Sequence, residues 1–548
     1  MQSIQKAMRR FFFITICVLT AWPQISPPAW GRLANEGKRG LYVRSIEQLL
    51  QLSEDEVDLA TAALIVSERW SDLVMGRRYL ARLDEMAVEI QKRLRRGRLA
   101  LDHHAIPIIN QYLFDELGFN TVSEANDPND LFLHSVLDKK QGYCLSLSIL
   151  YLSLGERLGI PMYGVVVPGH FFVRYDDGRT RWNIETTHAG TGMSDGHYVE
   201  KFNVPTGNKN TIYLKNLDKI QTLGCLFNNL GNTYADLGET DSALATLQLA
   251  VEINPALAES RANLGNIYLK MDLIDEAITE YHNALRVNPA DPKTHSNLGN
   301  AYVRKGWLRE AIAEYSDALQ LDPEFVDAHK NLAIAHCKDK QYQRAIQHLN
   351  EAATLDRNDA GLYNQFGEVY YQMGKYEKAI FQYKKALSIN EAFAESNFGL
   401  AACYYKLGLS DEEITAYRRA LSIKPDMLAA LVNLGNAYFR KQDYDAAIEQ
   451  YAKAAQRAPR DAWIHYNLAT AYTNKGNFKK AVDAYRTCVE IDPNMGDAHY
   501  GLAFGFYKLH KYQSAWKHIK IAQKLGVEIT QDHLDAIKRS VPAGEGKD

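Results

Sequence analysis

The sequence predicts a two-part protein, in which an α+β domain is followed by an all-α array of repeated helix pairs. The first part is indicated by residues 139–187, where an apolar helical run precedes three strand-like segments separated by turns. The second part is indicated by a pattern that returns every 34 residues from position 224 onward. At 548 residues, with 46% hydrophobic and 24% charged residues, the chain has the length and composition for several globular cores.

The first residues are typical of an export signal. Lys6, Arg9 and Arg10 precede an apolar stretch at residues 11–22, which is shorter than the about 20 residues that a membrane-spanning helix needs. We therefore expect a signal peptide within residues 1–30, cleaved near Ala21 or Ala29, and a periplasmic or secreted mature protein with no membrane span. The alternative is an uncleaved N-terminal anchor.

Residues 43–135 are expected to be helical, with capping residues at 53–56 before an apolar-periodic segment. The cationic run from Lys92 to Arg98 suits a helix C-terminus, where positive charge complements the helix dipole and Gly97 ends the helix. No second basic cluster accompanies this run and the net charge is −3, so nucleic-acid binding is not expected. His103 and His104 are interpreted as surface or hydrogen-bonded side chains.

Three residues in the central segment have the order and spacing of a cysteine catalytic triad. Cys144 begins the apolar helix, where the helix dipole and unpaired N–H groups favour the thiolate. His170 opens the second of the expected strands, at 162–167, 170–175 and 181–186, and has the position of a base for Cys144. A carboxylate or amide on the third strand, Glu185 or Asn183, would orient the histidine.

This region resembles the transglutaminase-like superfamily, in the bacterial branch whose core often precedes tetratricopeptide repeats, through the segments GYCLSLSILYL, PGHFFVR and WNIETT. The resemblance covers roughly residues 40–215. It implies a papain-like fold in which Cys144 attacks acyl carbons and His170 is the base. The third member, usually aspartate in the family, is then Glu185, with Asn183 as the alternative because it lies two residues away on the same strand face.

The remaining cysteines outside the N-terminal segment are expected to be free, buried thiols of the repeats, because no CxxC pair exists: Cys225, Cys337, Cys403 and Cys488. A metal site combining Cys144 and His170 with His188 and His197 lacks a recognisable ligand spacing. We therefore expect neither a metal nor another cofactor.

The 34-residue period is that of the tetratricopeptide repeat. Nine units occupy residues 224–529 and begin at 224, 258, 292, 326, 360, 394, 428, 462 and 496. Small residues at positions 8, 20 and 27 of each unit allow two antiparallel helices to approach closely, and Glu413 departs from this rule. The domains expected are thus a transglutaminase-like domain at residues 31–220, with its catalytic core at about 130–200, the repeats, and a capping helix with a tail at residues 530–548.

Such an array stacks into a superhelix whose concave face is lined by the first helix of each unit. On this face asparagine recurs at positions 6 and 9, as Asn229, Asn232, Asn263, Asn266, Asn297, Asn300, Asn331, Asn433, Asn436 and Asn467. A carboxamide offers donors and an acceptor to a peptide backbone, which predicts a protein or peptide partner in this groove. The same residues are also suited to fastening neighbouring units, and the sequence leaves both interpretations open.

Two functional hypotheses follow. The first is an exported cysteine-dependent acyl-transfer enzyme that hydrolyses or exchanges amide bonds, with the repeats holding the substrate or a partner protein. The alternative is a non-catalytic scaffold that has a degenerate transglutaminase-like domain. Protease, transglutaminase, amidase and deamidase all use the same thiolate–imidazole pair, so the sequence does not separate them.

Overall fold

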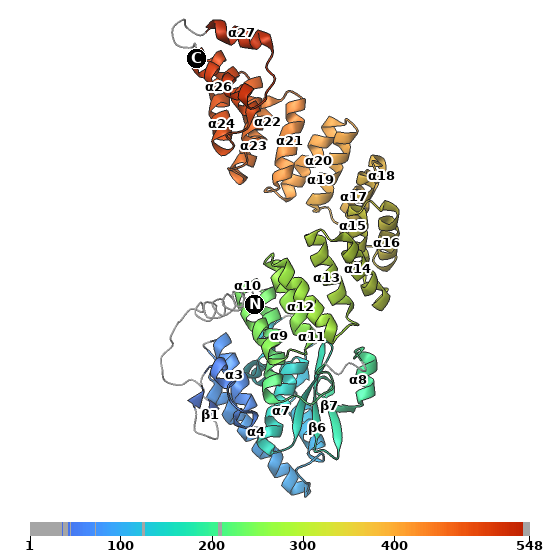
Figure 1. The fold of residues 1–548 in the computed structure, drawn as a ribbon. Coiled ribbons are helices and arrows are strands. Elements are labelled where there is room, and N and C mark those ends of the chain that lie inside the picture. Colours follow the sequence, from blue (N-terminus) through green and yellow to red (C-terminus); the bar gives the residue numbers. More distant parts are fainter. Residues whose placement is uncertain are drawn as a thin grey trace, which may run out of the picture. The chain divides into compact units, whose positions relative to one another are not determined.

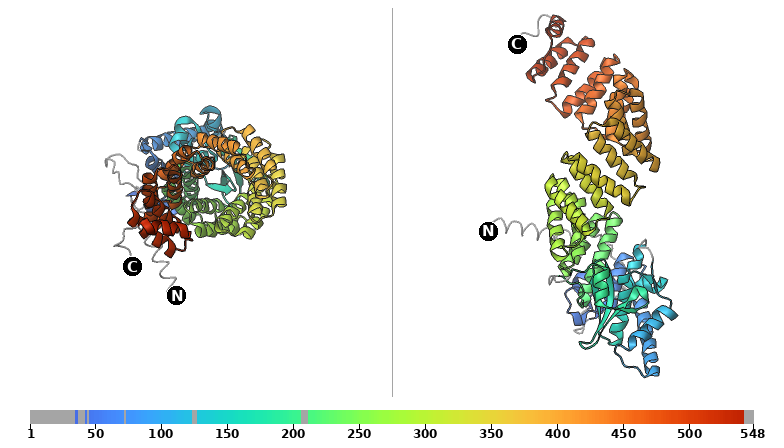
Figure 2. Two further views of the ribbon diagram at one scale, coloured as in Figure 1. Left: turned by 90° about the horizontal axis from the view of Figure 1, so that it is seen from above. Right: turned by 90° about the vertical axis from the view of Figure 1, so that its right-hand side faces the viewer.

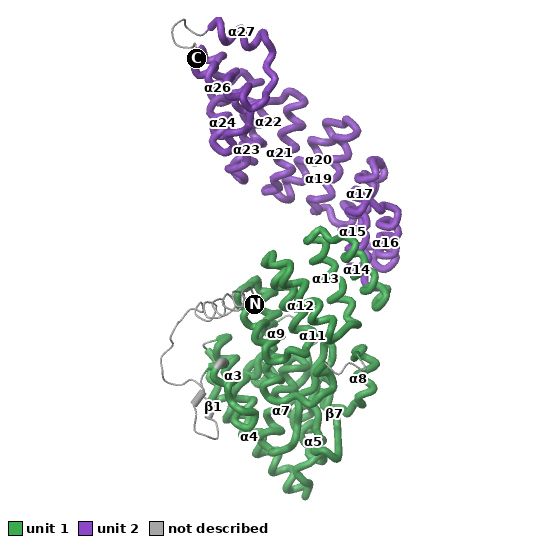
Figure 3. The backbone as a smooth tube through the Cα atoms, in the orientation of Figure 1, with its two compact units in different colours: residues 1–323 green, residues 324–548 purple. Residues whose placement is uncertain are grey.

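The computed structural model describes residues 35–36, 42–43, 45–71, 73–122, 127–205 and 211–540. The expected export signal and the C-terminal tail after residue 540 lie outside these ranges. The chain divides into two compact units, Met1–Pro323 and Glu324–Asp548 (Figure 3). The predicted fold class is confirmed: an α/β region is followed by an all-helical repeat array (Figure 1).

The first unit begins with helices that support the central segment. They are α2 (Ile46–Leu49), η1 (Glu54–Glu56), α3 (Leu59–Trp70), α4 (Gly76–Gly97), α5 (Ala105–Asn110), η2 (Gln111–Glu116), η3 (Pro128–Leu131) and α6 (Leu133–Lys139). Short strands accompany them: β1 (Asn35–Glu36) pairs with β2 (Tyr42–Val43), and β3 (Asn120–Thr121) pairs in parallel with β4 (Gln141–Gly142). Helix α4 ends at Gly97, as expected, and the capping residue Arg98 after it adopts the left-handed conformation (φ 53°). Its cationic run therefore does lie at a helix C-terminus.

Helix α7 (Cys144–Leu158) is the centre of this unit. It is apolar on most sides and is buried among α3, α4, α6 and the sheet, so nearly every turn contributes to the core. The helix ends at Gly159, which takes the left-handed conformation (φ 69°) that terminates many helices.

A four-stranded antiparallel sheet packs against α7, in the order β5 (Met162–Val167), β6 (His170–Asp176), β7 (Arg181–Glu185) and β8 (Thr191–Met193). Pro168 and Gly169 form the two-residue turn between β5 and β6, and Val167 pairs with His170 beside it. Strand β8 was not predicted from the sequence. After the sheet come η4 (Thr186–His188) and α8 (Asp195–Lys201), and the segment before α9 returns along β5 through a bridge between Leu217 and Gly164.

The first three repeats belong to the same compact unit. Their helices are α9 (Lys219–Asp236), α10 (Thr240–Ile253), α11 (Ala258–Lys270), α12 (Ile274–Val287), α13 (Pro292–Lys305) and α14 (Leu308–Leu321). In Figure 1 α9 lies beside the helices and sheet of the α/β region, and it contacts α3, η3 and β5; the colours of Figure 2 likewise show the green first repeats beside the cyan sheet region. One hydrophobic core runs without interruption from Ile46 in α2 to Val287 in α12. Packing therefore continues across the sequence boundary between the α+β region and the repeats.

The second unit continues with six further helix pairs and a final helix. They are α15 (Val326–Lys338), α16 (Tyr342–Leu355), α17 (Ala360–Gln372), α18 (Tyr376–Ile389), α19 (Ala394–Lys406), α20 (Ser410–Ile423), α21 (Leu428–Arg440), α22 (Tyr444–Arg457), α23 (Ala462–Asn474), α24 (Phe478–Ile491), α25 (Gly496–Lys508), α26 (Tyr512–Lys524) and α27 (Gln531–Ser540). Among the described helices of the chain, none is both long and apolar enough to cross a bilayer.

The repeat pattern has a direct steric cause. A Cβ atom added at Gly299 would lie 2.6 Å from the ring of Tyr315, and the same relation joins Gly435 to Tyr451. Glycine at position 8 therefore makes room for the tyrosine of the second helix. Where the pattern departs at Glu413, the buried carboxylate receives two hydrogen bonds, of 2.6 and 2.7 Å, from the guanidinium of Arg440 in the next repeat.

Candidate active site

The first turn of α7, the start of β6 and the end of β7 meet at one place and bring together Cys144, His170 and Glu185. His170 Nε2 lies 2.7 Å from Glu185 Oε2. The side chain of Cys144 is close enough to His170 to raise its pKa, and both residues line the same cavity. A thiol, an imidazole and a carboxylate in this order are the groups that cysteine-dependent acyl transfer requires.

The electrostatics of this group favour charged partners. The side chains of His170 and Glu185 are only 13% and 6% exposed. Burial alone would lower the pKa of His170, but its interactions with Cys144 and Glu185 outweigh it and raise the pKa to about 9. Burial would raise the pKa of Glu185, but the bonds to His170 and Thr187 lower it to about 2. At neutral pH the histidine is therefore an imidazolium held by a carboxylate.

The WNIETT segment fixes both halves of the site. Glu185 accepts hydrogen bonds from the Thr187 backbone N–H (3.1 Å) and hydroxyl (2.6 Å). The intervening Thr186 Oγ1 lies 3.0 Å from Ser148 Oγ and donates to the Cys144 carbonyl at 3.4 Å. The end of β7 thus holds His170 through Glu185 and the helix that begins at Cys144 through Thr186.

Asn183, the alternative third member, belongs to a different network. It accepts a hydrogen bond from Arg174 Nε (2.7 Å) and donates to Asp195 Oδ1 (2.7 Å) and the Met193 carbonyl (3.0 Å). The Arg174 side chain is almost fully buried and also donates to the Leu214 carbonyl. Asn183 therefore joins the sheet to the returning segment, and Glu185 occupies the place beside His170.

Two aromatic residues of this site were not singled out in the sequence. Phe202, just after α8, stacks on His170 with ring centroids 4.8 Å apart and planes 2° from parallel. Tyr198, four residues earlier, donates its hydroxyl to Glu185 Oε2 at 3.1 Å. A spacing of four residues puts both on the same side of α8 and its C-terminal cap, but aromatic residues at that spacing also occur in ordinary cores, so they carry no functional signal in the sequence.

A cavity of about 650 Å³ opens at Cys144 and His170 and continues along the first three repeats. This volume lies within the range of ligand sites in proteins. Its lining is rich in carboxamides from the helices α9, α11 and α13, namely Asn228, Asn229, Asn232, Asn263, Asn266 and Asn297. The groove residues predicted in the first unit are Asn229, Asn232, Asn263, Asn266, Asn297 and Asn300. All of them except Asn300 line this cavity.

The asparagines have structural bonds as well. Asn266, Asn300 and Asn436 each accept the hydroxyl of the tyrosine 15 residues later, at 2.6–2.7 Å. Asn263 donates to Asn228 and Asn297 donates to Asn266, both at 3.0 Å, across adjacent repeats. The fastening role is therefore real for these residues. Among the described residues, no partner takes Oδ1 of Asn263 or Nδ2 of Asn266.

In the second unit, the asparagine series is interrupted at Ile334, Gln365 and Glu368. A separate cavity of about 400 Å³ lies there, lined mainly by apolar side chains such as Ile334 and Val369. The predicted residues Asn331, Asn433, Asn436 and Asn467 also belong to this unit.

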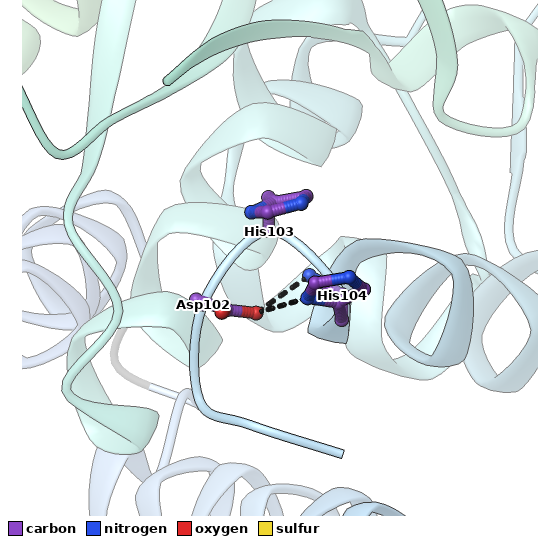
Figure 4. Close-up of side chains that lie close together, drawn as sticks. All are labelled: Asp102, His103 and His104. Atoms are coloured by element: carbon purple, nitrogen blue, oxygen red, sulfur yellow. Dashed lines mark hydrogen bonds and ion pairs between the residues drawn. The ribbon is translucent and has the colours of Figure 1, made fainter. Parts of the chain in front are cut away.

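Two clusters in the described chain have side chains close enough to hold a metal ion, and neither contains Cys144 or His170. In Asp102–His103–His104, the Asp102 carboxylate accepts from the His104 backbone N–H (2.9 Å) and lies 2.8 Å from its Nδ1, as the dashed lines of Figure 4 show. In the second cluster, His295 lies 2.7 Å from Glu314. Arg261 and Glu280 occupy the same positions one repeat earlier, so this pair follows a helix–helix ion-pair pattern.

Comparison with known families supports the two-part organisation. A family model described as the transglutaminase-like superfamily matches residues 77–226. Models of the tetratricopeptide repeat match segments between residues 231 and 494.

Similarity to individual proteins is confined to short stretches. A UPF0162 protein of Xylella fastidiosa is 41% identical over 73 residues, which are 13% of this chain and 26% of that protein. A UPF0162 protein of Pseudomonas aeruginosa is 29% identical over 138 residues, or 25% and 51% of the two chains. F-box only protein 21 of Homo sapiens is 34% identical over 82 residues, or 15% and 13%. The chain thus spans about a quarter of the length of the first of these relatives.

Among solved structures, a crystal structure of MamA is 29% identical and covers 30% of this chain and 95% of its own, with a TM-score of 0.27. A likeness at this TM-score supports no functional inference.

Proposed function

We propose that this chain, in which a transglutaminase-like domain (residues 77–226) is followed by tetratricopeptide repeats (residues 231–494), is a cysteine-dependent acyl-transfer enzyme acting on amide bonds of peptides or proteins. The observation that carries the proposal is the contact of His170 with both Cys144 and Glu185 at the mouth of a cavity. Burying the charged side chains of His170 and Glu185 costs free energy of desolvation. We would not expect a domain that had lost its catalytic function to retain this pair.

The reaction follows from the positions of these side chains. The Cys144 thiolate attacks the acyl carbon, and the developing oxyanion is stabilised by N–H groups of the first turn of α7, which have no acceptor within the helix. The His170 imidazolium gives its proton to the leaving amine as the C–N bond breaks, which leaves a thioester on Cys144. Water or a second amine then attacks, His170 takes its proton, and the thiolate is released. Glu185 orients His170 throughout and favours its charged form before the amine leaves and after the thiolate is released.

The first three repeats supply the substrate-binding surface. Their carboxamides line the cavity that begins at the thiol, and amide groups suit an extended polypeptide whatever its side chains. Each hydrogen bond contributes about 0.5–1.5 kcal/mol, so capture of a polypeptide requires several together. Tetratricopeptide repeats are protein-interaction modules, and a partner protein in the groove is part of the proposal.

We also propose export to the periplasm or the outside, on the basis of the basic and apolar residues before residue 30. N-terminal sequencing of the mature protein tests this. Recovery of the intact N-terminus in a membrane fraction would establish the anchor, and a full-length cytoplasmic protein would contradict both forms.

Selective alkylation tests the catalytic proposal. Burial raises the pKa of Cys337 to about 11, of Cys403 to about 12 and of Cys488 to about 11, so these thiols are protonated at pH 7.5. Iodoacetamide at this pH should modify Cys144 at least tenfold faster than these three, as measured by peptide mass spectrometry. His170→Ala should slow Cys144 selectively. Equal rates at all four cysteines would favour the non-catalytic scaffold.

The groove is tested with the pair Asn263→Ala and Asn297→Ala, because neither side chain bonds to a tyrosine of its own repeat. The double variant should retain its helix content by circular dichroism and lose most of its capture of unfolded polypeptide, with reduced carboxymethylated lactalbumin as the probe. The matched control is Asn433→Ala with Asn467→Ala in the second unit. Normal capture by the first variant would remove this surface from the proposal.

A further inference from the structure

The second repeat reaches the turn that carries the catalytic histidine. Glu259, in the first turn of α11, accepts the backbone N–H of Gly169 on Oε1 at 3.2 Å. Its Oε2 accepts the hydroxyl of Tyr213 at 2.7 Å. Gly169 is the second residue of the β5–β6 turn, and His170 follows it directly. Glu259 lines the same cavity as Cys144 and His170.

The Gly169 amide needs this partner for a geometric reason. Gly169 has φ +69°, as the second central residue of a type II turn does, and Pro168 precedes it. In such a turn the hydrogen bond across the turn uses the following residue, so the glycine N–H points away from the hairpin. A backbone N–H facing a cavity wall without a partner costs free energy. Glu259 supplies the acceptor.

The second bond of Glu259 holds the other side of β5. Tyr213 lies in the returning segment, where the N–H of Leu214 donates to Val166 (3.1 Å) and the N–H of Leu217 donates to Gly164 (2.9 Å). One carboxylate therefore connects the turn at the end of β5 with the segment that runs beside it.

This role is not a general feature of the repeat. The equivalent position is Cys225 in the first repeat and Lys293 in the third. In the sixth repeat it is Glu395, which is exposed and lies 3.6 Å from Lys424. By contrast, burial raises the pKa of Glu259 above its usual range, although the bonds from Tyr213 and Gly169 oppose that rise. An acidic side chain in such surroundings is favoured only by a specific contact.

We propose that Glu259 is a positioning residue, which holds the β5–β6 turn and thereby His170 within reach of Cys144 and Glu185. The inference rests on the proposed function of Cys144 and His170. It makes the repeat array part of the active site. Helix α11 also carries Asn263 and Asn266 on the same face, four and seven residues after Glu259, so the helix that positions the histidine also lines the polypeptide groove.

The test follows the ring of His170 in the full chain by NMR with ¹³C-labelled histidine, assigned by loss of one signal in His170→Ala. Glu259→Ala should lower the His170 pKa, about 9 with both partners in place, by at least one unit, because the ring moves away from Cys144 and Glu185. Glu259→Gln retains an acceptor for Gly169 and should restore most of the pKa. Glu395→Ala, at the same repeat position, should leave it unchanged.

Deuterium exchange at residues 168–170 shows whether the contact itself is lost. Faster exchange in Glu259→Ala with an unchanged His170 pKa would overturn the proposal. If Glu259→Ala does not fold, Tyr213→Phe removes half of the contact and should produce a smaller fall in the same direction; no fall there would also overturn it. The His170 pKa reports on the ring's surroundings with or without catalysis. Wild-type Cys144 that is alkylated independently of His170 would therefore refute the proposed function separately.

Discussion

Replacement of Glu185 by glutamine isolates the contribution of its charge to the site. The substitution retains the size of the side chain and its capacity to hydrogen-bond, but removes the negative charge beside His170 Nε2. In the native protein, interactions with Cys144 and Glu185 raise the pKa of His170 from 6.5 to about 9 against the opposing effect of burial. In the variant His170 is still buried, but its interaction with residue 185 is weaker. The pKa of His170 should therefore fall by at least about one unit, which corresponds to about 1.4 kcal/mol.

The sign of the pH effect follows from this shift. A histidine with a raised pKa is charged at every pH below that value, so the native imidazolium persists from neutral pH to about 9. Its interaction with Glu185 stabilises the fold below pH 6.5, and this contribution is lost as the pH rises through about 9. In Glu185→Gln the imidazolium should lose its proton nearer to neutrality.

The assay compares alkylation of Cys144 by iodoacetate and by iodoacetamide between pH 6 and 10. An imidazolium attracts the anionic reagent, so the iodoacetate-to-iodoacetamide rate ratio should fall as His170 loses its proton. The midpoint should lie near pH 9 in the native protein and at least one unit lower in Glu185→Gln. Glu395→Gln, an exposed glutamate in the second unit, should retain the native midpoint. A native midpoint in Glu185→Gln would refute the role assigned to this carboxylate, and a shift in Asn183→Ala would return that role to Asn183.

Three further predictions concern the repeats. Arg440→Ala leaves the buried Glu413 carboxylate without its partner and should lower the free energy of unfolding of a fragment of residues 324–548 by about 3 kcal/mol, measured in urea. Glu413→Ala restores the usual small residue and should be nearly neutral, so equal losses in the two variants would contradict this account. Burial and neighbouring histidines lower the pKa of His348 and of His518 to about 4, so the folded protein has its full stability above pH 6.5 and should lose at most about 3 kcal/mol for each histidine as the pH falls to 4. Stability that does not change between pH 6.5 and 4, or a loss that persists in the His348→Gln and His518→Gln double variant, would refute the role of these histidines. The fragment of residues 324–548 should unfold cooperatively on heating. A fragment that starts at residue 217 exposes Leu223, Leu226 and Phe227 of the core shared with the α/β region, so it should bind a hydrophobic dye. If it binds no dye, the first repeats do not depend on this core.

Local patterns predicted much of this fold. The strand spans around His170, the helix that begins at Cys144 and the 34-residue period were all visible in the sequence, because each depends on neighbours within one element or one repeat. The sequence could not decide whether Glu185 or Asn183 lies beside His170, because both are on one face of β7. Only their contacts distinguish them: Glu185 contacts His170 on β6, whereas Asn183 contacts Met193 on β8.

Contacts between segments far apart in the sequence could not be predicted from such local patterns. Glu259 lies 90 residues after Gly169, and at its position the repeats carry residues of several kinds. Glu413 was visible only as a departure from the pattern, since its partner Arg440 lies in the next repeat. The shared core of the first unit likewise depends on the packing of α9 against helices far earlier in the chain.

The most direct test of the central claim is detection of an acyl group on Cys144. The full chain is mixed with p-nitrophenyl acetate at pH 7.5, quenched in acid and analysed by intact and peptide mass spectrometry. We expect one acetyl group per chain, located on Cys144, that is released on further incubation, is absent in Cys144→Ala and accumulates much more slowly in His170→Ala. Acetylation spread over the other cysteines and lysines, or an equal rate in His170→Ala, would contradict the assignment of Cys144 and His170 as nucleophile and base.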